Sequence, residues 1–158
     1  MLQKYISQLT SNTRLTTAYS LDRVRRLAEH FWNPQESYKT IHIAGTNGKW
    51  SVSQMTFAIL KEAWCKVGIF TSPYLLDITE SIQTNDGYIP HERFTKYFEE
   101  ILKIAPQTTF FEAKTIAAFC YFRDTGCEYG VIEVGLGGRL DATNILTHPS
   151  VTCITSIG

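Results

Sequence analysis

The sequence predicts an α/β fold with a mainly parallel sheet flanked by helices. A short apolar run at 40–44 leads through a glycine-rich loop into a helical stretch at 49–64, and a second apolar run follows at 67–71. A strand, a helix and another strand within about 30 residues form a βαβ unit, whose two strands are parallel. Two later apolar runs, at 129–135 and 150–156, extend the same sheet.

The loop at 45–49 reads Gly-Thr-Asn-Gly-Lys, and its place between a strand and a helix is typical of phosphate-binding (P-loop) folds. Its glycines let backbone N–H groups turn toward an anion, and the next helix directs its positive end to the same place. Lys49 can reach the outer phosphates, and the Ser51 hydroxyl is a candidate Mg²⁺ ligand. The match to GxxxxGK[ST] is incomplete, because Ile43 and Trp50 occupy two of its positions. A glycine-rich turn without a ligand is the alternative.

Length and composition indicate one soluble domain over 1–158, with 1–36 as an amino-terminal helical segment. Fifteen basic and fifteen acidic side chains cancel, so bulk charge gives no argument for nucleic acid or a membrane as partner. No signal peptide and no apolar run of about 18 residues is visible, which predicts a cytoplasmic protein. The four cysteines form no CxxC pair and are expected to be reduced core thiols: Cys65, Cys120, Cys127 and Cys153.

Two helices are expected before the first strand, at 2–10 and after Ser20, which can cap the second one. A polar run from Thr10 to Thr17 separates them, and Asn33-Pro34 should end the second. The second helix has an apolar face and a charged one. Its arginines are interpreted as a solvated face, with binding of a substrate anion as the alternative: Arg23, Arg25 and Arg26.

The second half of the chain adds a loop, two helices and a turn. Residues 72–90 fit neither helix nor strand, and a loop of this length in one domain is usually functional. Helices are expected at 91–104 and 109–124. Glu112 stands beside two phenylalanines in the second of these, where a carboxylate is costly unless it is paired or bound to a cation; an exposed position is the alternative.

The strand at 129–135 ends in a turn at 136–144 that is rich in glycine and charge. Ligands of parallel sheets bind at this end of a strand. Asp141 and Asn144 are therefore candidate site residues, and the alternative is a turn that their side chains merely stabilise.

Together these stretches resemble the amino-terminal ATPase portion of folylpolyglutamate synthase and dihydrofolate synthase, in the Mur ligase superfamily. The resemblance extends from Leu21 to Gly158 and rests on four motifs. They are Gly-Thr-Asn-Gly-Lys at 45–49, Thr-Ser-Pro at 71–73 with Glu80 and Asn85, Phe-Glu at 111–112 with Thr115 and Ala118-Phe119, and Glu-Val-Gly-Leu-Gly-Gly-Arg-Leu-Asp-Ala-Thr-Asn at 133–144. The last is the most specific.

The resemblance implies ATP-dependent addition of L-glutamate to dihydropteroate or folate through an acyl phosphate, in folate biosynthesis and one-carbon metabolism. Phosphoryl transfer of this kind needs charge neutralisation more than a covalent partner. It implies roles in catalysis for Lys49 and Asp141. It implies ATP binding by Gly45, Thr46, Asn47, Gly48, Lys49, Ser51, Arg139 and Asn144. It implies Mg²⁺ binding by Ser51, Ser72 and Glu112, places Thr143 near the acyl phosphate or folate, and makes 72–90 a mobile folate-contacting loop.

Four residues depart from the family's pattern. Trp50 stands where the family has glycine, and Tyr74 replaces a histidine. Ser81 replaces the arginine that usually follows Glu80, and Lys114 takes a normally apolar position. An indole directly after Lys49 would either obstruct the phosphates or point away from them.

Family members are also longer. They continue into a Leu-Asp-His motif, a carbamylated lysine and a carboxyl-terminal domain. The fold is therefore expected to be incomplete relative to the family, and the chain is expected to be inactive alone. Rival interpretations are another Mur-type amide ligase and a non-catalytic nucleotide-binding or interaction module. An unpaired last strand and an uncovered sheet face would expose apolar surface and favour self-association.

Overall fold

A mixed sheet of six strands forms the centre of the computed structural model, which describes residues 2–15 and 20–158. The strand order is β4-β3-β2-β5-β1-β6. The strands are β1 (Lys39–Ala44), β2 (Val67–Phe70), β3 (Ile82–Thr84), β4 (Gly87–Tyr88), β5 (Tyr129–Glu133) and β6 (Val151–Ile154). Strands β2, β5, β1 and β6 are parallel, whereas β3 and β4 join one edge as an antiparallel hairpin. The mainly parallel sheet predicted from the sequence is confirmed, with β5 inserted between β1 and β2.

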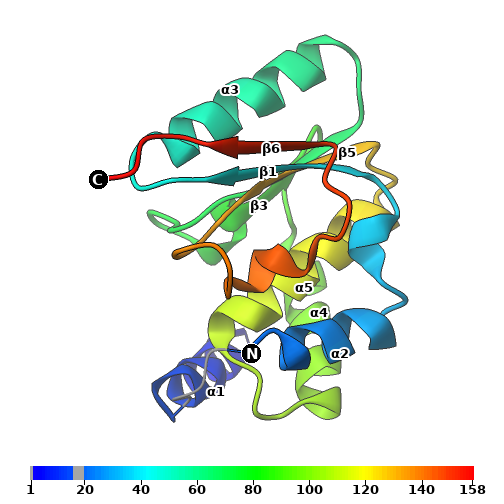
Figure 1. Cartoon of the computed structure of the whole chain (residues 1–158). Helices are drawn as coiled ribbons and strands as arrows, with labels where there is room; N and C mark the ends of the chain where they lie inside the picture. Colours follow the sequence, from blue (N-terminus) through cyan, green and yellow to red (C-terminus); the bar gives the residue numbers. More distant parts are fainter. Residues whose placement is uncertain (1, 16–19) are drawn as a thin grey trace.

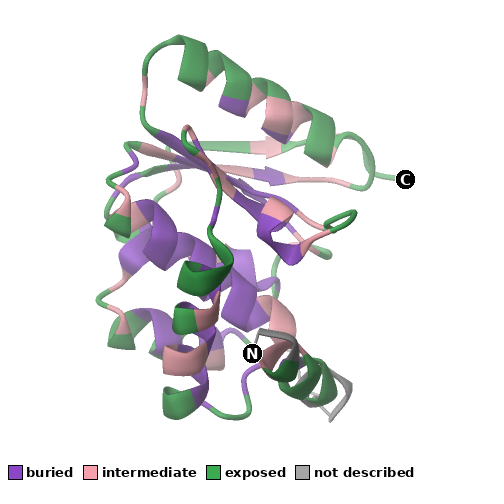
Figure 2. Cartoon of the chain, turned by 180° about the vertical axis from the view of Figure 1, so that it is seen from behind, coloured by how far each residue is buried: buried purple, intermediate pink, exposed green. Residues whose placement is uncertain are grey.

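Helices cover both faces of the sheet (Figure 1). Among the helices of the described residues, α3 lies alone on one face, and the others lie on the opposite face, with α5 against the sheet. The helices are α1 (Leu2–Leu15), α2 (Asp22–His30), α3 (Lys49–Glu62), α4 (His91–Ile104) and α5 (Phe110–Asp124), and three 3₁₀ turns are η1 (Pro34–Glu36), η2 (Ile78–Ser81) and η3 (Ala142–Ile145). Figure 2 shows that α5 is buried along most of its length, whereas α3 keeps an exposed outer side.

The large core between the sheet and α5 depends on close packing. Phe119 and Phe122 of α5 are fully buried. A Cβ atom at Gly68 of β2 would lie only 2.4 Å from the Phe122 ring, so only glycine lets the helix approach the strand this closely. A smaller cluster that includes Ile43 and Phe57 fills the space between the sheet and α3. The carboxyl ends of β1, β2 and β5 are thereby fixed relative to one another.

The structure corrects the expectation of an irregular loop at 72–90, because this segment contains η2 and the β3–β4 hairpin. Gly87 has φ +113°, a conformation that favours glycine and allows the tight turn. The Asn85 side chain ties the hairpin to the strand beside it, since its Oδ1 accepts the Val67 N–H at 2.7 Å and its Nδ2 donates to the Cys65 carbonyl at 3.0 Å. The segment is an edge of the sheet.

The first helix is also longer than expected and continues to Leu15. Thr10 and Ser11 do not break it, because their hydroxyls donate to the carbonyls of Ile6 and Ser7 one turn earlier. The rest of the polar run, 16–17, lies outside the described residues. The N-cap of α2 is Leu21 and not the expected Ser20, although the Ser20 Oγ accepts the Asp22 N–H at 3.1 Å.

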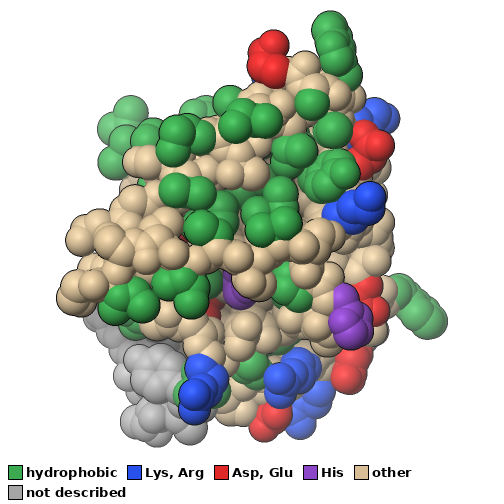
Figure 3. Space-filling model, turned by 45° about the horizontal axis from the view of Figure 1, so that its top comes forward, with side chains coloured by type: hydrophobic (Ala, Val, Ile, Leu, Met, Phe, Trp, Pro, Cys, Tyr) green, Lys and Arg blue, Asp and Glu red, His purple; other side chains and the backbone are tan. Residues whose placement is uncertain are grey.

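The last strand is not unpaired as expected, since β6 pairs in parallel with β1 and forms the outer edge of the sheet. The expectation of exposed apolar surface is confirmed. The exposed apolar side chains of α3, β6 and the segment that follows β6 are Trp50, Met55, Ile59, Val151, Ile154 and Ile157. Figure 3 shows hydrophobic side chains gathered on the face that carries α3 and β6.

The thiols agree in part with the prediction of reduced core cysteines. All four are free; Cys120 and Cys127 are buried, whereas Cys65 and Cys153 are partly exposed. Within residues 2–15 and 20–158, no helix is both long enough and apolar enough to cross a membrane.

Candidate functional site

The glycine-rich loop leaves β1 with backbone angles that favour glycine at two positions. Gly45 has φ +133° and Gly48 has φ +84°, and a Cβ atom at Gly45 would overlap the Thr155 hydroxyl. Lys49 begins α3 and folds back over the loop. Its Nζ donates to the carbonyl oxygens of Gly45 at 2.7 Å and Thr46 at 3.3 Å. The loop therefore holds a lysine ammonium at the carboxyl end of β1, where an anion can reach it.

The segment after β6 braces the other side of the loop. The Thr46 N–H donates to the Ser156 carbonyl at 2.7 Å, and the Thr155 hydroxyl donates to the Asn47 carbonyl at 2.7 Å. The N–H groups of Thr46 and Asn47 are therefore engaged, and the donors available to an anion include the Lys49 ammonium and the N–H groups in the first turn of α3. Ser51 lies in that turn and is exposed, as is Trp50, with 56% of its surface accessible.

Glu133, the last residue of β5, is the functional candidate that sequence reasoning missed. It is 2% exposed, and its Oε2 accepts the Ser72 N–H at 3.0 Å. Burial raises the pKa of its carboxyl, while the Ser72 hydrogen bond and the charges of Lys49 and Lys114 act in the opposite direction. A carboxylate in the apolar run Val131-Ile132-Glu133-Val134 was the available signal, because such a group needs a partner.

Glu112 is buried and paired, so the alternative of an exposed position is wrong. Arg23 Nε donates to Glu112 Oε2 at 2.8 Å, and Arg23 Nη2 donates to Glu112 Oε1 at 2.9 Å. The same Oε2 accepts the N–H and the hydroxyl of Thr109, each at 2.8 Å, in a capping box at the start of α5. The expectation of a fully solvated arginine face is therefore wrong for Arg23, although Arg25 and Arg26 are exposed.

The turn after β5 contains the side-chain hydrogen bonds expected if Asp141 and Asn144 stabilise it. Asp141 Oδ2 accepts the Leu136 N–H at 2.8 Å, and Oδ1 accepts the N–H of Thr143 at 3.0 Å and its hydroxyl at 2.6 Å. The Asn144 side chain donates to the Arg139 carbonyl at 2.9 Å. Asp141 and Asn144 thus hold the turn in shape.

His42 of β1 supports this turn and was also missed. Its Nε2 lies 2.9 Å from the Thr143 hydroxyl. Burial lowers the pKa of His42, and the nearby charge of Asp141 partly offsets this effect.

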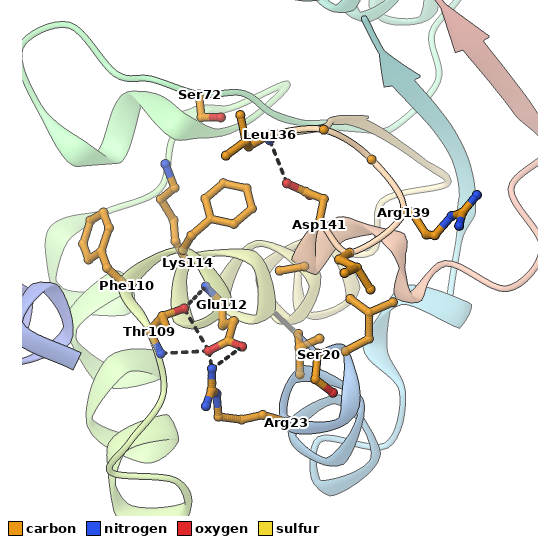
Figure 4. Close-up of a pocket in the computed structure, with 18 of the residues that line it drawn as sticks. Ser20, Arg23, Ser72, Thr109, Phe110, Glu112, Lys114, Leu136, Arg139 and Asp141 are labelled. Carbon is orange, nitrogen blue, oxygen red and sulfur yellow. Dashed lines mark hydrogen bonds and ion pairs between the residues drawn. The ribbon is translucent and has the colours of Figure 1, made fainter. Parts of the chain in front are cut away.

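A cavity of about 820 Å³ opens beside these groups. Its wall is mostly apolar and comes from the start of α2, the segment after β2, the first two turns of α5 and the turn after β5. Of the predicted site residues, it brings together Ser72, Glu112, Arg139 and Asp141. Figure 4 shows that Arg139 points away from the centre of this group. The glycine-rich loop, with Lys49 and Ser51, does not line the cavity; Lys49 acts electrostatically on Glu133 instead.

Lys114 is the unexpected charge in the cavity wall. It is 3% exposed, and its Nζ donates to the Ser81 hydroxyl at 3.2 Å. Two of the departures from the family's pattern, Ser81 and Lys114, therefore contact each other. Burial lowers the pKa of Lys114 to about 8, and the charge of Glu133 opposes this shift.

No protein-family model matches the sequence. The dihydrofolate synthetase of Saccharomyces cerevisiae is 42% identical over 137 residues, which are 84% of this chain and 32% of that protein. The chain thus spans about one third of the length of this relative and of two others, and a smaller share of several more.

Solved structures of folylpolyglutamate synthases are also similar to this chain. A folylpolyglutamate synthase from Thermotoga maritima is 36% identical, with a TM-score of 0.88 over 99% of this chain and 39% of that one. A bifunctional folylpolyglutamate and dihydrofolate synthase with Mn, AMPPNP and L-glutamate bound is 33% identical, with a TM-score of 0.86 over 99% of this chain and 37% of that one.

Replacing Lys114 by Met should stabilise the chain at neutral pH by about 1–3 kcal/mol, because a buried ammonium with one hydrogen bond is costly. The folded pKa of about 8 lies below the reference value of 10.5, so the unfolded chain binds the proton more tightly. Stability of the unaltered chain should therefore rise between these two pH values, and its deficit relative to the variant should shrink. Urea unfolding near neutral pH and at about pH 10 measures both effects.

Lys96→Met removes the same charge from an exposed site on α4 and serves as the control. It should change stability by less than about 0.5 kcal/mol at either pH. A Lys114→Met protein that is less stable than the unaltered chain at neutral pH would contradict the claim that burying this ammonium costs stability.

Proposed function

Because the chain belongs to the folylpolyglutamate and dihydrofolate synthase family, we propose that it carries the ATP-binding part of a ligase that joins L-glutamate to dihydropteroate or a folate. The relatives are about three times as long. The proposal for this chain is therefore limited to the site that activates the acid. The observation that carries the proposal is the position of Glu133, held by Ser72 and in the field of Lys49.

The phosphates of ATP would lie at the carboxyl end of β1. Lys49 and the first-turn N–H groups of α3 supply the positive charge and donors for them. When bound, ATP supplies the γ-phosphoryl group that activates the substrate carboxylate, and the amino group of glutamate then displaces it. Preorganised charge at this point is the main contribution that a protein makes to phosphoryl transfer.

We assign the metal site to the Ser72 hydroxyl and the Glu133 carboxylate. Both are hard oxygen donors, as Mg²⁺ prefers, and they are already joined by the bond from the Ser72 N–H. Glu112 fits this role less well, because Arg23 and Thr109 occupy both of its oxygens. Ser51 is a further candidate from the first turn of α3.

The cavity is the proposed site of the pterin and its aromatic acid. Its mostly apolar wall suits a flat ring system, and one of its sides leads to Ser72. Asp141 acts here by fixing the turn that forms the wall. Arg139 points away from the labelled group and is exposed, so it would meet charge only at the rim (Figure 4).

Binding of ATP·Mg²⁺ to this chain, measured by calorimetry, tests the proposal. Lys49→Met should weaken it about tenfold or more, since a charge-assisted contact to phosphate is lost. Lys96→Met is the matched control and should leave the affinity unchanged. Equal affinities for the unaltered chain and Lys49→Met would exclude the loop as the phosphate site.

A non-catalytic nucleotide-binding module is the second candidate, favoured by the exposed Trp50 beside Lys49 and by the engagement of the Thr46 N–H. The two candidates differ in phosphoryl transfer. Acyl-phosphate formation from dihydropteroate would exclude the module, whereas ATP binding without any such product would support it. No observation favours another Mur-type amide ligase.

We also propose self-association through the apolar face of α3 and β6 described above. Exposed apolar patches and free strand edges favour it. Sedimentation should show a mass that rises with concentration, and the double variant Ile59→Lys/Ile154→Lys should remain monomeric. Tyr88→Lys, at the opposite edge of the sheet, is the control and should still associate. A monomer at all concentrations for the unaltered chain would refute this.

A further inference from the structure

Lys114 is a buried cation whose hydrogen-bonding capacity is largely unused. An ammonium has three donors, and Ser81 Oγ is the single acceptor found for it within the described residues. No carboxylate in the described part of the chain forms an ion pair with it within 4 Å. Buried lysines are normally paired. The described residues thus leave donors of Lys114 available to an acceptor from outside the chain.

Aromatic rings surround this ammonium on several sides. Its Nζ lies 5.5 Å from the ring centre of Phe70, 5.6 Å from Phe111, 5.8 Å from Tyr74 and 5.9 Å from Phe110. Ring faces stabilise the charge and keep water away, but they accept no ordinary hydrogen bond. The aromatic groups therefore offset part of the cost of the buried charge but leave it poorly hydrated, which strengthens its attraction for an anion.

The position of Lys114 links the cavity to the proposed phosphate site. The residue lines the cavity, and its side chain extends from α5 toward the segment that carries Ser72 (Figure 4). It is close enough to Glu133 for each charge to affect the pKa of the other. A ligand that fills the apolar cavity and ends in an anionic group would bring this group between Lys114 and Ser72.

We propose that Lys114 binds the carboxylate of an aromatic acid in the cavity and positions it for phosphorylation beside Ser72 and Glu133. This inference rests on the proposed function and adds a binding residue to it. The ligand class is a flat, mostly apolar ring system that ends in a carboxylate. The alternative anion is a phosphate oxygen of ATP, which offers the same chemistry to the ammonium.

The experiment compares pteroate with its primary amide, which has the same rings without the charge. Calorimetry on the unaltered chain should show about tenfold or greater preference for pteroate, because a poorly hydrated cation binds a carboxylate strongly. Lys114→Met should reduce this preference to about one and leave the affinity for ATP·Mg²⁺ within about twofold. Lys96→Met is the matched control and should keep the preference.

The variant Ser81→Ala distinguishes ligand binding by Lys114 from a purely structural role of its bond to Ser81. Ser81→Ala removes the one acceptor found for Lys114 among the described residues but leaves the ammonium in place, so the preference for pteroate should persist. Thermal unfolding of each variant shows that it is folded. Loss of the preference in Ser81→Ala together with its retention in Lys114→Met would overturn the inference.

The remaining outcomes are also decisive. If Lys114→Met keeps the preference for pteroate but loses ATP affinity, the anion is a phosphate and the carboxylate assignment is wrong. If Lys114→Met keeps both, the inference fails while the proposed function stands. If the unaltered chain binds neither pteroate nor ATP·Mg²⁺, both fail.

Discussion

The central place of β5, paired in parallel with β1 on one side and β2 on the other, decides which groups of this molecule can meet. The carboxyl ends of these three strands lie at one edge of the sheet. The loop with Lys49 follows β1, Ser72 comes shortly after β2, and Glu133 closes β5. Because α5 packs directly against the same strands through Phe122 and Gly68, it brings its own polar residues to that edge. The site is a consequence of strand order.

The charges around this edge fall into two sets with different roles. Glu112 and Arg23 satisfy each other through two short bonds and join α2 to α5, so they build the wall of the cavity. Glu133 and Lys114 are less completely paired: within the described residues, the Ser72 N–H is the one donor found for the Glu133 carboxylate, and the Ser81 hydroxyl is the one acceptor found for Lys114. Incompletely paired buried charges cost stability. Such groups are expected where a ligand supplies the missing partner.

The sequence predicts local and periodic features of this fold well. The strand, loop and helix around Lys49 follow from residues close together in the chain, and so do the helices 91–104 and 109–124. It predicts less well where the answer depends on distant residues. The partner of Glu112 is Arg23, 89 positions away, so no local pattern could show that this carboxylate is paired. The hairpin in 72–90 had a local signal, Asp86-Gly87, but its strands are too short to show an alternating pattern.

Glu133 shows that a local motif is also insufficient to assign the role of each residue in it. Its motif identifies a site, but the motif alone does not say which of its polar residues faces the phosphates. Asp141 is the more conspicuous carboxylate of the turn, yet its oxygens accept bonds from Leu136 and Thr143. The strand direction and the bond to Ser72 are the observations that favour Glu133 in the proposed metal site.

The most direct test of this account is the binding of Mn²⁺, as a substitute for Mg²⁺, in the presence of a non-hydrolysable ATP analogue. Electron paramagnetic resonance of free Mn²⁺ gives its affinity for the unaltered chain, Glu133→Gln and Glu112→Gln. The account predicts that Glu133→Gln loses about tenfold or more in affinity while Glu112→Gln keeps it, because only the former carboxylate is available to a metal. Loss of Mn²⁺ binding in Glu112→Gln with full binding in Glu133→Gln would contradict the central claim.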